Sequence, residues 1–308
     1  MISNLIIVNP YSGNGKAKKS HEIIKNWLTA HPDIQNVTNL FYSNTLQETI
    51  DLISNISNSI KKILIVGGDG SLNQFLNHSP NFEQFMIGII PSGSGNDFIK
   101  NIKLPNKIVA QLELYLNSEP RLLFSDILEA SFSSNGHSDF SNYIINSMGI
   151  VFDGLVAYHK NKSNIDNGIL SYIVSVFSSL KDRKSYRAKI LHSNSTFTNC
   201  DPLLLICIGN GISSGGGFYL TPNALITDGL FDISVIKDIS TLKLLKSLPL
   251  ALINKIEGIP EISFFKEVEA EINLMNKTHV HIDGELITGN FDRIHIKLAE
   301  KKLKLMVL

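Results

Sequence analysis

Short apolar runs alternate with helical patterns in the first third of the chain. Three runs rich in β-branched residues are typical of strands buried on both faces of a sheet: LIIV (5–8), KILIV (62–66) and MIGII (86–90). Between them, apolar residues recur at helical spacing in two stripes: Ile23, Ile24, Trp27 and Leu28, then Leu46, Ile50, Ile53 and Ile60. This alternation predicts a parallel sheet with helices on both sides, a three-layer α/β domain over residues 1–121.

After about residue 121 the pattern changes to strict alternation of apolar and polar residues. Five segments show it: YRAKIL (186–191), FDISVI (231–236), VEAEINL (268–274), HVHIDGE (279–285) and RIHIKL (293–298). Such alternation is typical of antiparallel sheets with one buried face. Helical patterns interrupt it near 154–180 and 240–253, and the serine- and asparagine-rich segments 131–142 and 192–199 indicate loops. We therefore predict an antiparallel, β-sandwich-like domain over residues 122–289.

The composition narrows the class of protein. The chain has 308 residues, 43% of them apolar, and its 28 basic residues balance 28 acidic ones, so no long-range attraction to nucleic acid is expected. Cys200 and Cys207 lie among apolar residues, which favours buried, reduced thiols and the cytoplasm. No signal peptide is recognisable, and the longest apolar run, LLLICI (203–208), is far shorter than the roughly 20 residues that span a bilayer. We expect a soluble cytoplasmic protein.

Each of the three apolar strands ends in a glycine-rich phrase. The phrases are NPYSGNGK (9–16), GGDGSLN (67–73) and PSGSGND (91–97). Because ligands of open α/β sheets bind beyond the carboxyl ends of the strands, three such loops could present backbone N–H groups to one phosphate. A single loop of this kind is as easily an ordinary turn, but three together favour binding. The Walker pattern fails at Pro10 and Ala17, and the dinucleotide pattern fails at Lys18 and Phe98.

These phrases resemble the three nucleotide-binding signatures of the diacylglycerol kinase catalytic family, which includes bacterial lipid kinases and sphingosine kinases. The later part of the chain is similar to that family as well: NSMGIVFDGLV (146–156), GNGISSGGGFYLTPNALITDGLFDI (209–233) and HIDGE (281–285). The resemblance runs from residue 9 to residue 285 in the family's order. It implies two domains with the nucleotide in the cleft between them, and last strands, about 290–308, that return to the first domain. Ser71 and Ser94 stand where threonine is usual, Gln74 replaces a common glutamate, and Tyr11 is bulky for its loop.

The family's activity requires bound phosphates, a divalent cation and a base for the attacking hydroxyl. The resemblance implies ATP and Mg²⁺ as cofactors, and these nucleotide-binding residues: Asn9, Pro10, Ser12, Gly13, Asn14, Ser43, Gly67, Gly68, Asp69, Gly70, Ser71, Asn73, Ser94 and Asp97. Thr45 is a further candidate, although Thr45-x-x-Glu48 also spells a helix capping box. Ser94 has a similar alternative, as a helix cap with Asp97 three residues later.

Carboxylates are the candidates for catalysis. By resemblance Glu285 is the general base, Asp283 supports it, and Asp97 and Asp126 form a network that orders water and metal around Asp69. Asp126 has an alternative role as a polar residue at a strand edge. If residues 279–285 form one strand, His279, His281, Asp283 and Glu285 share a face, and an iron or zinc site is the minor alternative.

A structural Mg²⁺ site is implied near ITDGLF (226–231). By resemblance, the Asp228 carboxylate and the carbonyls of Leu225 and Leu230 bind the ion, as suits a hard cation that keeps part of its water. The alternative is an Asp-Gly turn without an ion.

The acceptor is the part that the sequence defines least. We expect a lipid kinase that phosphorylates diacylglycerol; alternatives are a sphingoid base, ceramide or monoacylglycerol, an NAD kinase, or a non-catalytic nucleotide-binding regulator. A lipid acceptor implies peripheral contact with a membrane, for which two lysine groups are candidates unless they are simply solvated: Lys16, Lys18 and Lys19, and Lys160 and Lys162. We expect no nucleic-acid partner, and a homodimer is left open.

Overall fold

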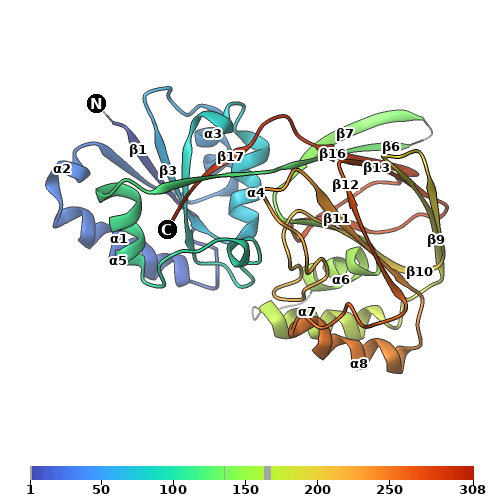
Figure 1. The fold of residues 1–308 in the computed structure, drawn as a ribbon. Helices are drawn as coiled ribbons and strands as arrows, with labels where there is room; N and C mark the ends of the chain where they lie inside the picture. The colour runs from blue at the N-terminus through green and yellow to red at the C-terminus, as the bar shows by residue number, and fades with distance from the viewer. Residues whose placement is uncertain (1, 135, 163–167) are drawn as a thin grey trace. The chain divides into compact units, whose positions relative to one another are not determined.

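The computed structural model describes residues 2–134, 136–162 and 168–308 (Figure 1). The chain divides into two compact units, one formed by Met1–Ser125 with Lys301–Leu308 and the other by Asp126–Glu300. The predicted boundaries differ from these. Residues 290–300, expected to return to the first domain, belong to the second unit, because the strand Arg293–Leu298 pairs within its sheet. Only the last strand, Leu303–Val307, joins the first sheet.

The first unit is built on a six-stranded sheet. Its strands are β1 (Asn4–Val8), β2 (Thr38–Tyr42), β3 (Lys62–Gly67), β4 (Met86–Pro91), β5 (Arg121–Ser125) and β17 (Leu303–Val307). They lie in the order β2-β1-β3-β4-β17-β5, and all neighbours are parallel except β17 and β5. The predicted parallel arrangement of the three apolar runs is confirmed.

Helices cover both faces of this sheet, as predicted (Figure 1). The helices are α1 (Lys16–Thr29), α2 (Pro32–Gln35), α3 (Leu46–Ser54), α4 (Asp69–His78) and α5 (Ile108–Leu112), with 3-10 turns at Phe82–Gln84 and Phe98–Asn101 and a π-helical turn at Glu113–Asn117. On one face, Ile24 and Trp27 of α1 pack with Ile6 and Leu64 of the strands. Ile60, assigned to the second helical stripe, lies between α3 and β3 instead.

The second unit is built on an antiparallel sheet. Its strands are β6 (Leu128–Ser134), β7 (His137–Ile144), β8 (Ser147–Val151), β9 (Tyr186–His192), β10 (Phe197–Gly209), β11 (Phe231–Lys237), β12 (Ile262–Glu267), β13 (Glu269–Leu274), β14 (Val280–Ile282), β15 (Glu285–Ile287) and β16 (Arg293–Leu298). They lie in the order β15-β14-β8-β10-β9-β13-β16-β6-β7, with β11 between β10 and β12. Apolar residues of these strands face one another in one core, so the sandwich-like prediction is confirmed.

Two local predictions in this unit are wrong. Residues 131–142, predicted as a loop, pair across the hairpin of β6 and β7, for example Phe132 with Phe140. The segment 279–285, predicted as one strand, turns at Asp283 and Gly284 into the hairpin of β14 and β15. Both residues have positive φ, +49° and +88°, which is typical of a tight two-residue hairpin turn.

Three helices pack on the second unit's sheet: α6 (Phe152–Asn161), α7 (Gly168–Ser179) and α8 (Thr241–Leu252). An apolar cavity of about 50 Å³ lies between these helices and the sheet. Tyr172, Val176, Phe218, Leu244 and Ile259 are among the residues that line it.

Candidate functional site

The glycine-rich phrases follow β1, β3 and β4, so they lie together at the carboxyl edge of the parallel strands. The middle phrase is only partly a loop. Gly67 ends β3, Gly68 is the N-cap, and α4 begins at Asp69, so Gly70, Ser71 and Asn73 belong to the helix. The N–H groups of the first turn of a ten-residue helix therefore lie at this edge.

Glycines let the three phrases touch one another. A Cβ on Gly68 would stand 2.9 Å from Gly93 Cα, and one on Gly13, whose φ is +61°, would stand 1.8 Å from Ser92 O. Ser20 of α1, the helix that follows the first phrase, contacts Ser92 of the third phrase, with 3.1 Å between their hydroxyl oxygens. The requirement for glycine thus comes from loop packing in this chain, whether or not a phosphate is bound.

Asp69 fixes the third phrase to the second. Its Oδ2 accepts from the N–H of Asp97 at 2.9 Å, and its Oδ1 accepts from the N–H of Phe98 at 3.0 Å. Asp97 itself is buried, and its Oδ1 accepts from Lys100 Nζ at 2.6 Å. Asn96, which sequence reasoning missed, closes the loop by bonds to both backbone groups of Gly93. These bonds hold the third phrase in place beside the second.

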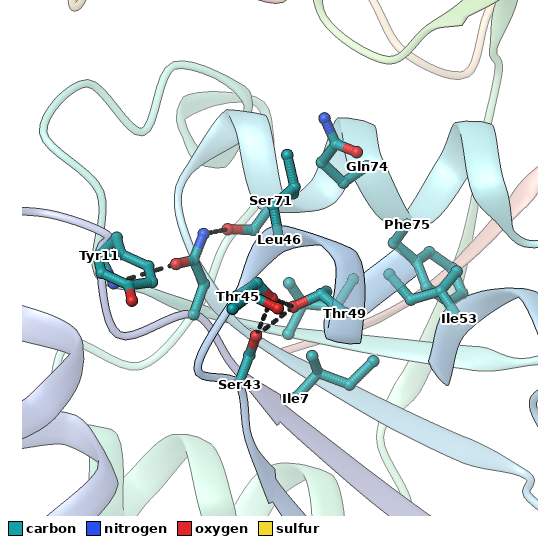
Figure 2. A pocket seen from close by; sticks show the side chains of 12 residues that line it. Ile7, Tyr11, Ser43, Thr45, Leu46, Thr49, Ile53, Ser71, Gln74 and Phe75 are labelled. Carbon is teal, nitrogen blue, oxygen red and sulfur yellow. Dashed lines mark hydrogen bonds between the residues drawn. The ribbon is translucent and has the colours of Figure 1, made fainter. Parts of the chain in front are cut away.

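A pocket of about 220 Å³ opens beside these phrases (Figure 2). Its floor is apolar, from Ile7, Ile53, Ile65 and Phe75, and its rim is polar. Of the predicted residues, Asn9, Ser43 and Ser71 line it. This mixture of an apolar floor and a few polar groups is typical of small-molecule sites.

Hydrogen bonds fix the polar rim of the pocket. Asn9 Nδ2 donates to Ser71 Oγ at 3.0 Å, and Thr49 Oγ1 donates to Ser43 Oγ at 2.7 Å (Figure 2). Thr49 was not foreseen. Thr45 lines the pocket and also caps α3, since its Oγ1 accepts from the N–H of Glu48 at 3.2 Å, so the predicted cap is confirmed.

The remaining predicted residues of this unit lie in or beside the loops. Pro10 is buried, Ser12 is half-buried, and Asn14 and Ser94 are exposed. Ser94 is not the cap of the next turn, which follows Asp97 without a side-chain cap bond. Gln74 lines the pocket, and its buried Oε1 has no hydrogen-bond partner among the described residues. A buried acceptor of this kind is costly unless a ligand or water satisfies it.

The hairpin of β14 and β15 carries the acidic pair of the second unit. Asp283 is buried, and its carboxylate accepts from the N–H groups of Ile145, Asn146 and Ser147 at 3.1, 2.9 and 2.9 Å. Glu285, directly after the turn, is exposed. The single face expected for 279–285 does not form, because the turn sends Asp283 and Glu285 to different surroundings. Asp283 is therefore an anchor of the hairpin.

A buried, hydrogen-bonded histidine–aspartate pair lies beneath this hairpin. His281 Nε2 is 2.9 Å from Asp153 Oδ2, and Tyr172 of α7 donates to Asp153 Oδ1 at 2.9 Å. Burial by itself would raise the pKa of the Asp153 carboxyl, but the attraction and hydrogen bond of His281, the Tyr172 hydroxyl and the charge of Lys160 outweigh it and hold the pKa below its usual value. Asp153 is consequently ionised at neutral pH.

The metal alternative at the histidines does not form. His281 faces Asp153, whereas the His279 ring stacks on Tyr158 with centroids 4.8 Å apart. In the part of the chain that the structure describes, no three histidine, cysteine or acidic side chains gather as metal ligands.

The arrangement around Asp228 does not fit the expected structural Mg²⁺. Its Oδ1 accepts from the N–H of Leu230 at 3.1 Å, and its Oδ2 is 3.4 Å from Lys266 Nζ. The same ammonium donates to Asp232 at 2.8 Å and to the carbonyl of Asn223 at 3.1 Å. A lysine therefore pairs with the carboxylate that was expected to bind the ion, and Leu225 is exposed.

Asp126 belongs to the second unit and braces the same turn. Its Oδ2 accepts from the N–H of Gly229 at 2.9 Å, and its own N–H donates to the carbonyl of Ile226 at 2.6 Å. The side chain therefore has a definite structural contact beside any role in an aspartate network.

Comparison with known proteins assigns the family. Residues 3–123 match the diacylglycerol kinase catalytic domain, and residues 146–299 match the YegS C-terminal NAD kinase beta sandwich-like domain. A Shewanella frigidimarina protein named "Probable lipid kinase YegS-like" is 30% identical over 241 residues, 75% of this chain and 72% of its own. The chain belongs to the diacylglycerol kinase family. Bacillus subtilis diacylglycerol kinase, a more distant member, is 24% identical over 250 residues, 78% of each chain.

Solved structures agree on the fold of this family member. A diacylglycerol kinase from Bacillus anthracis superposes with a TM-score of 0.70 at 20% identity, covering 99% of this chain and 97% of the other. Yeast NADH kinase complexed with NADH gives 0.59 at 11% identity, covering 100% and 84%. The fold is therefore that of diacylglycerol kinases and NAD kinases, and the lipid kinase family is given by the sequence matches.

Proposed function

We propose that the protein is an ATP-dependent kinase that transfers the γ-phosphoryl group to the hydroxyl of a lipid alcohol, with diacylglycerol as the first candidate and phosphatidic acid as its product. The observation that carries the proposal is the pocket between Asn9, Ser43 and Ser71, which opens beside three glycine phrases and a helix N-terminus. In this arrangement the apolar floor receives the base or ribose, and backbone N–H groups receive the phosphates.

Mg²⁺ is proposed as the partner of ATP's phosphates, where it would neutralise the charge that develops during phosphoryl transfer. The buried loop bonds of Asp69 and Asp97 keep these carboxylates beside the phosphate-binding edge. Their proposed part is to orient water and cation around the nucleotide.

The second unit is proposed to hold the acceptor. Its apolar cavity, lined by Val176, Phe218 and Leu244 among others, supports an acyl chain as ligand, since it offers few polar groups for a nucleotide such as NAD. Glu285 is the proposed general base because it is the exposed carboxylate of the hairpin that matches the family's D-G-E. The retained carboxylate also argues against a non-catalytic regulator.

Contact with an anionic membrane is part of the proposal. Helix α7 exposes Leu170, Val174 and Phe177, which recur at helical spacing and so lie on one face. Lys160 and Lys162 at the end of α6 supply positive charge in the same unit, and His159 of α6 contacts Asp182 just beyond α7 at 2.9 Å. Within the described residues no helix is long and apolar enough to cross a bilayer. An apolar face beside lysines is suited to the interface, where each lysine contributes about 1 kcal/mol.

Product identification tests the proposal. The protein is incubated with γ-labelled ATP, Mg²⁺ and mixed micelles that carry one acceptor each: diacylglycerol, monoacylglycerol, ceramide, a sphingoid base, or none with NAD added. We expect label in phosphatidic acid. Label in another lipid would change the acceptor, and label only in NADP, or none in any product while ATP binds, would overturn the proposal.

A further inference from the structure

We propose that His281 is a positioning residue: its Nδ1 accepts from the Gly284 N–H, and its Nε2–H donates to Asp153, so that the turn before Glu285 is held in one place. This inference rests on the proposed function, because the turn matters for catalysis only if Glu285, which follows it, is the general base. Four observations support this proposal.

The first observation is the direction of the two bonds that His281 makes. The Gly284 N–H can only donate, and it lies 3.3 Å from Nδ1, so Nδ1 is the acceptor. Nε2 then carries the ring proton and donates to Asp153 Oδ2 at 2.9 Å. Only this tautomer satisfies both neighbours, and the other would set two N–H groups against each other.

The second observation is that the sheet leaves room for this pair. Gly149 of β8 is paired with His281 of β14 on one side and with Cys207 of β10 on the other. A Cβ on Gly149 would stand 2.3 Å from His281 Nε2 and 2.2 Å from Asp153 Oδ2. Gly149 therefore leaves the space that the Asp153 carboxylate and the His281 ring occupy.

The third observation concerns the groups that face the pair from each packed element. Tyr172 of α7 donates to the second oxygen of Asp153, Lys160 of α6 attracts it, and the thiol of Cys207, whose pKa burial and Asp153 raise well above its usual value, stays neutral. Asp153 thus keeps its charge and its orientation, and it holds the imidazole as a fixed acceptor for the turn.

The fourth observation is that two side chains, Asp283 and His281, anchor the turn. Asp283 holds it through three backbone N–H groups of the 145–147 segment, and His281 holds it through Gly284. Glu285 comes next and makes the first pair of β15 with Ile282. Loss of the His281 contact removes the bond at Gly284, while the bonds of Asp283 and the strand pairing remain.

Two substitutions separate the two bonds. In His281→Asn the side-chain oxygen takes the place of Nδ1 and keeps the Gly284 contact, whereas in His281→Gln the longer amide takes the place of Nε2 and keeps only the Asp153 contact. We expect hydrogen exchange of the Gly284 amide to accelerate in His281→Gln and to stay close to wild type in His281→Asn. His295→Gln is the matched control, since His295 is a half-exposed histidine in the same sheet that pairs with Glu269.

Kinetics with the lipid acceptor give the second readout. We expect kcat to fall about 10- to 100-fold in His281→Gln, the range for a misplaced catalytic group, with KM for ATP unchanged and with His281→Asn retaining most of the rate. Equal exchange and equal kcat in the two variants would overturn the positioning role. Absence of lipid phosphorylation by the wild type would instead overturn the proposed function, and the exchange comparison would stand by itself.

The tautomer can be measured without any variant. ¹⁵N shifts of the His281 ring at neutral pH are expected to show a protonated Nε2 and an unprotonated Nδ1. A protonated Nδ1 would contradict the proposal even if both substituted proteins fail to fold.

Discussion

Lys266 pairs with Asp228, the carboxylate at which a structural cation was expected. Its ammonium lies between Asp228 and Asp232, and the Asp232 side chain is only 5% exposed. Burial raises the pKa of the Asp232 carboxyl, the bond and charge of Lys266 lower it, and Asp228 raises it again. Because the balance leaves this pKa above its value in the unfolded chain, Asp232 favours folding most at acidic pH, and its contribution decreases as the pH rises through the folded-state pKa.

Lys266→Met should therefore destabilise the protein more at pH 7 than at pH 4. Without the ammonium, a buried carboxylate must ionise unpaired, which we expect to cost about 1 kcal/mol at neutral pH and less when the carboxyl is protonated. Urea unfolding at the two pH values measures it, with Lys243→Met, at an exposed pair with Glu261, as control. EDTA should leave the unfolding of the wild type unchanged. A loss of stability on chelation would restore the structural Mg²⁺.

At the scale of elements, the packing of α6 on the sheet depends on Gly149, which leaves room for Asp153 of that helix. Gly149→Ala should destabilise the second unit by about 1–3 kcal/mol, the usual cost of overpacking, because its Cβ would meet the His281 and Asp153 pair. Gly258→Ala is the matched control, since a Cβ there meets nothing within 4 Å. Denaturant unfolding of both variants checks this, and equal midpoints would contradict the packing described for α6.

The sequence pattern predicted elements wherever burial was uniform. β1, β3 and β4 are buried almost throughout, so their apolar runs were enough to predict them as strands. β2, with the sequence TNLFY, is mostly half-buried and carries no such run. The strands within residues 131–142 were not predicted, because the segment is rich in serine and asparagine. Phe132 and Phe140 pack together there, with ring centroids 4.8 Å apart. In residues 279–285, Asp-Gly is a typical hairpin-turn dipeptide, but the alternation of polar and apolar residues around it favoured a single strand.

The sequence predicted the motifs of the candidate site, but not the hydrogen bonds that hold its residues together. The three phrases follow from glycine spacing after apolar strands. That Asp69 binds the backbone of residues 97 and 98, or that His281 meets Asp153, could not be predicted, because each bond joins residues far apart in sequence. Tyr172 and Thr49 carried no signal, since a single hydroxyl in a helix is ordinarily a surface or packing residue.

At the scale of the whole molecule, membrane contact should depend on the exposed face of α7. Phe177→Asp should weaken binding to phosphatidylglycerol vesicles several-fold, because it removes apolar area and adds negative charge. Phe197→Asp, at a similarly exposed phenylalanine on β10, should not. Vesicle sedimentation measures both, with phosphatidylcholine vesicles as the uncharged comparison. Equal losses in the two variants would exclude α7 as the docking face.

We propose that the first unit binds ATP and that the second unit activates the acceptor hydroxyl through Glu285. The most direct measurement is the steady-state kcat of Glu285→Gln with saturating diacylglycerol, together with the calorimetric affinity for ATP. Glutamine keeps the size of the side chain but cannot accept the proton, so kcat should fall about 10²–10⁴-fold, the range of general-base catalysis, while ATP affinity stays unchanged. A near-normal kcat, or a loss of ATP affinity that accounts for the lower rate, would contradict the account.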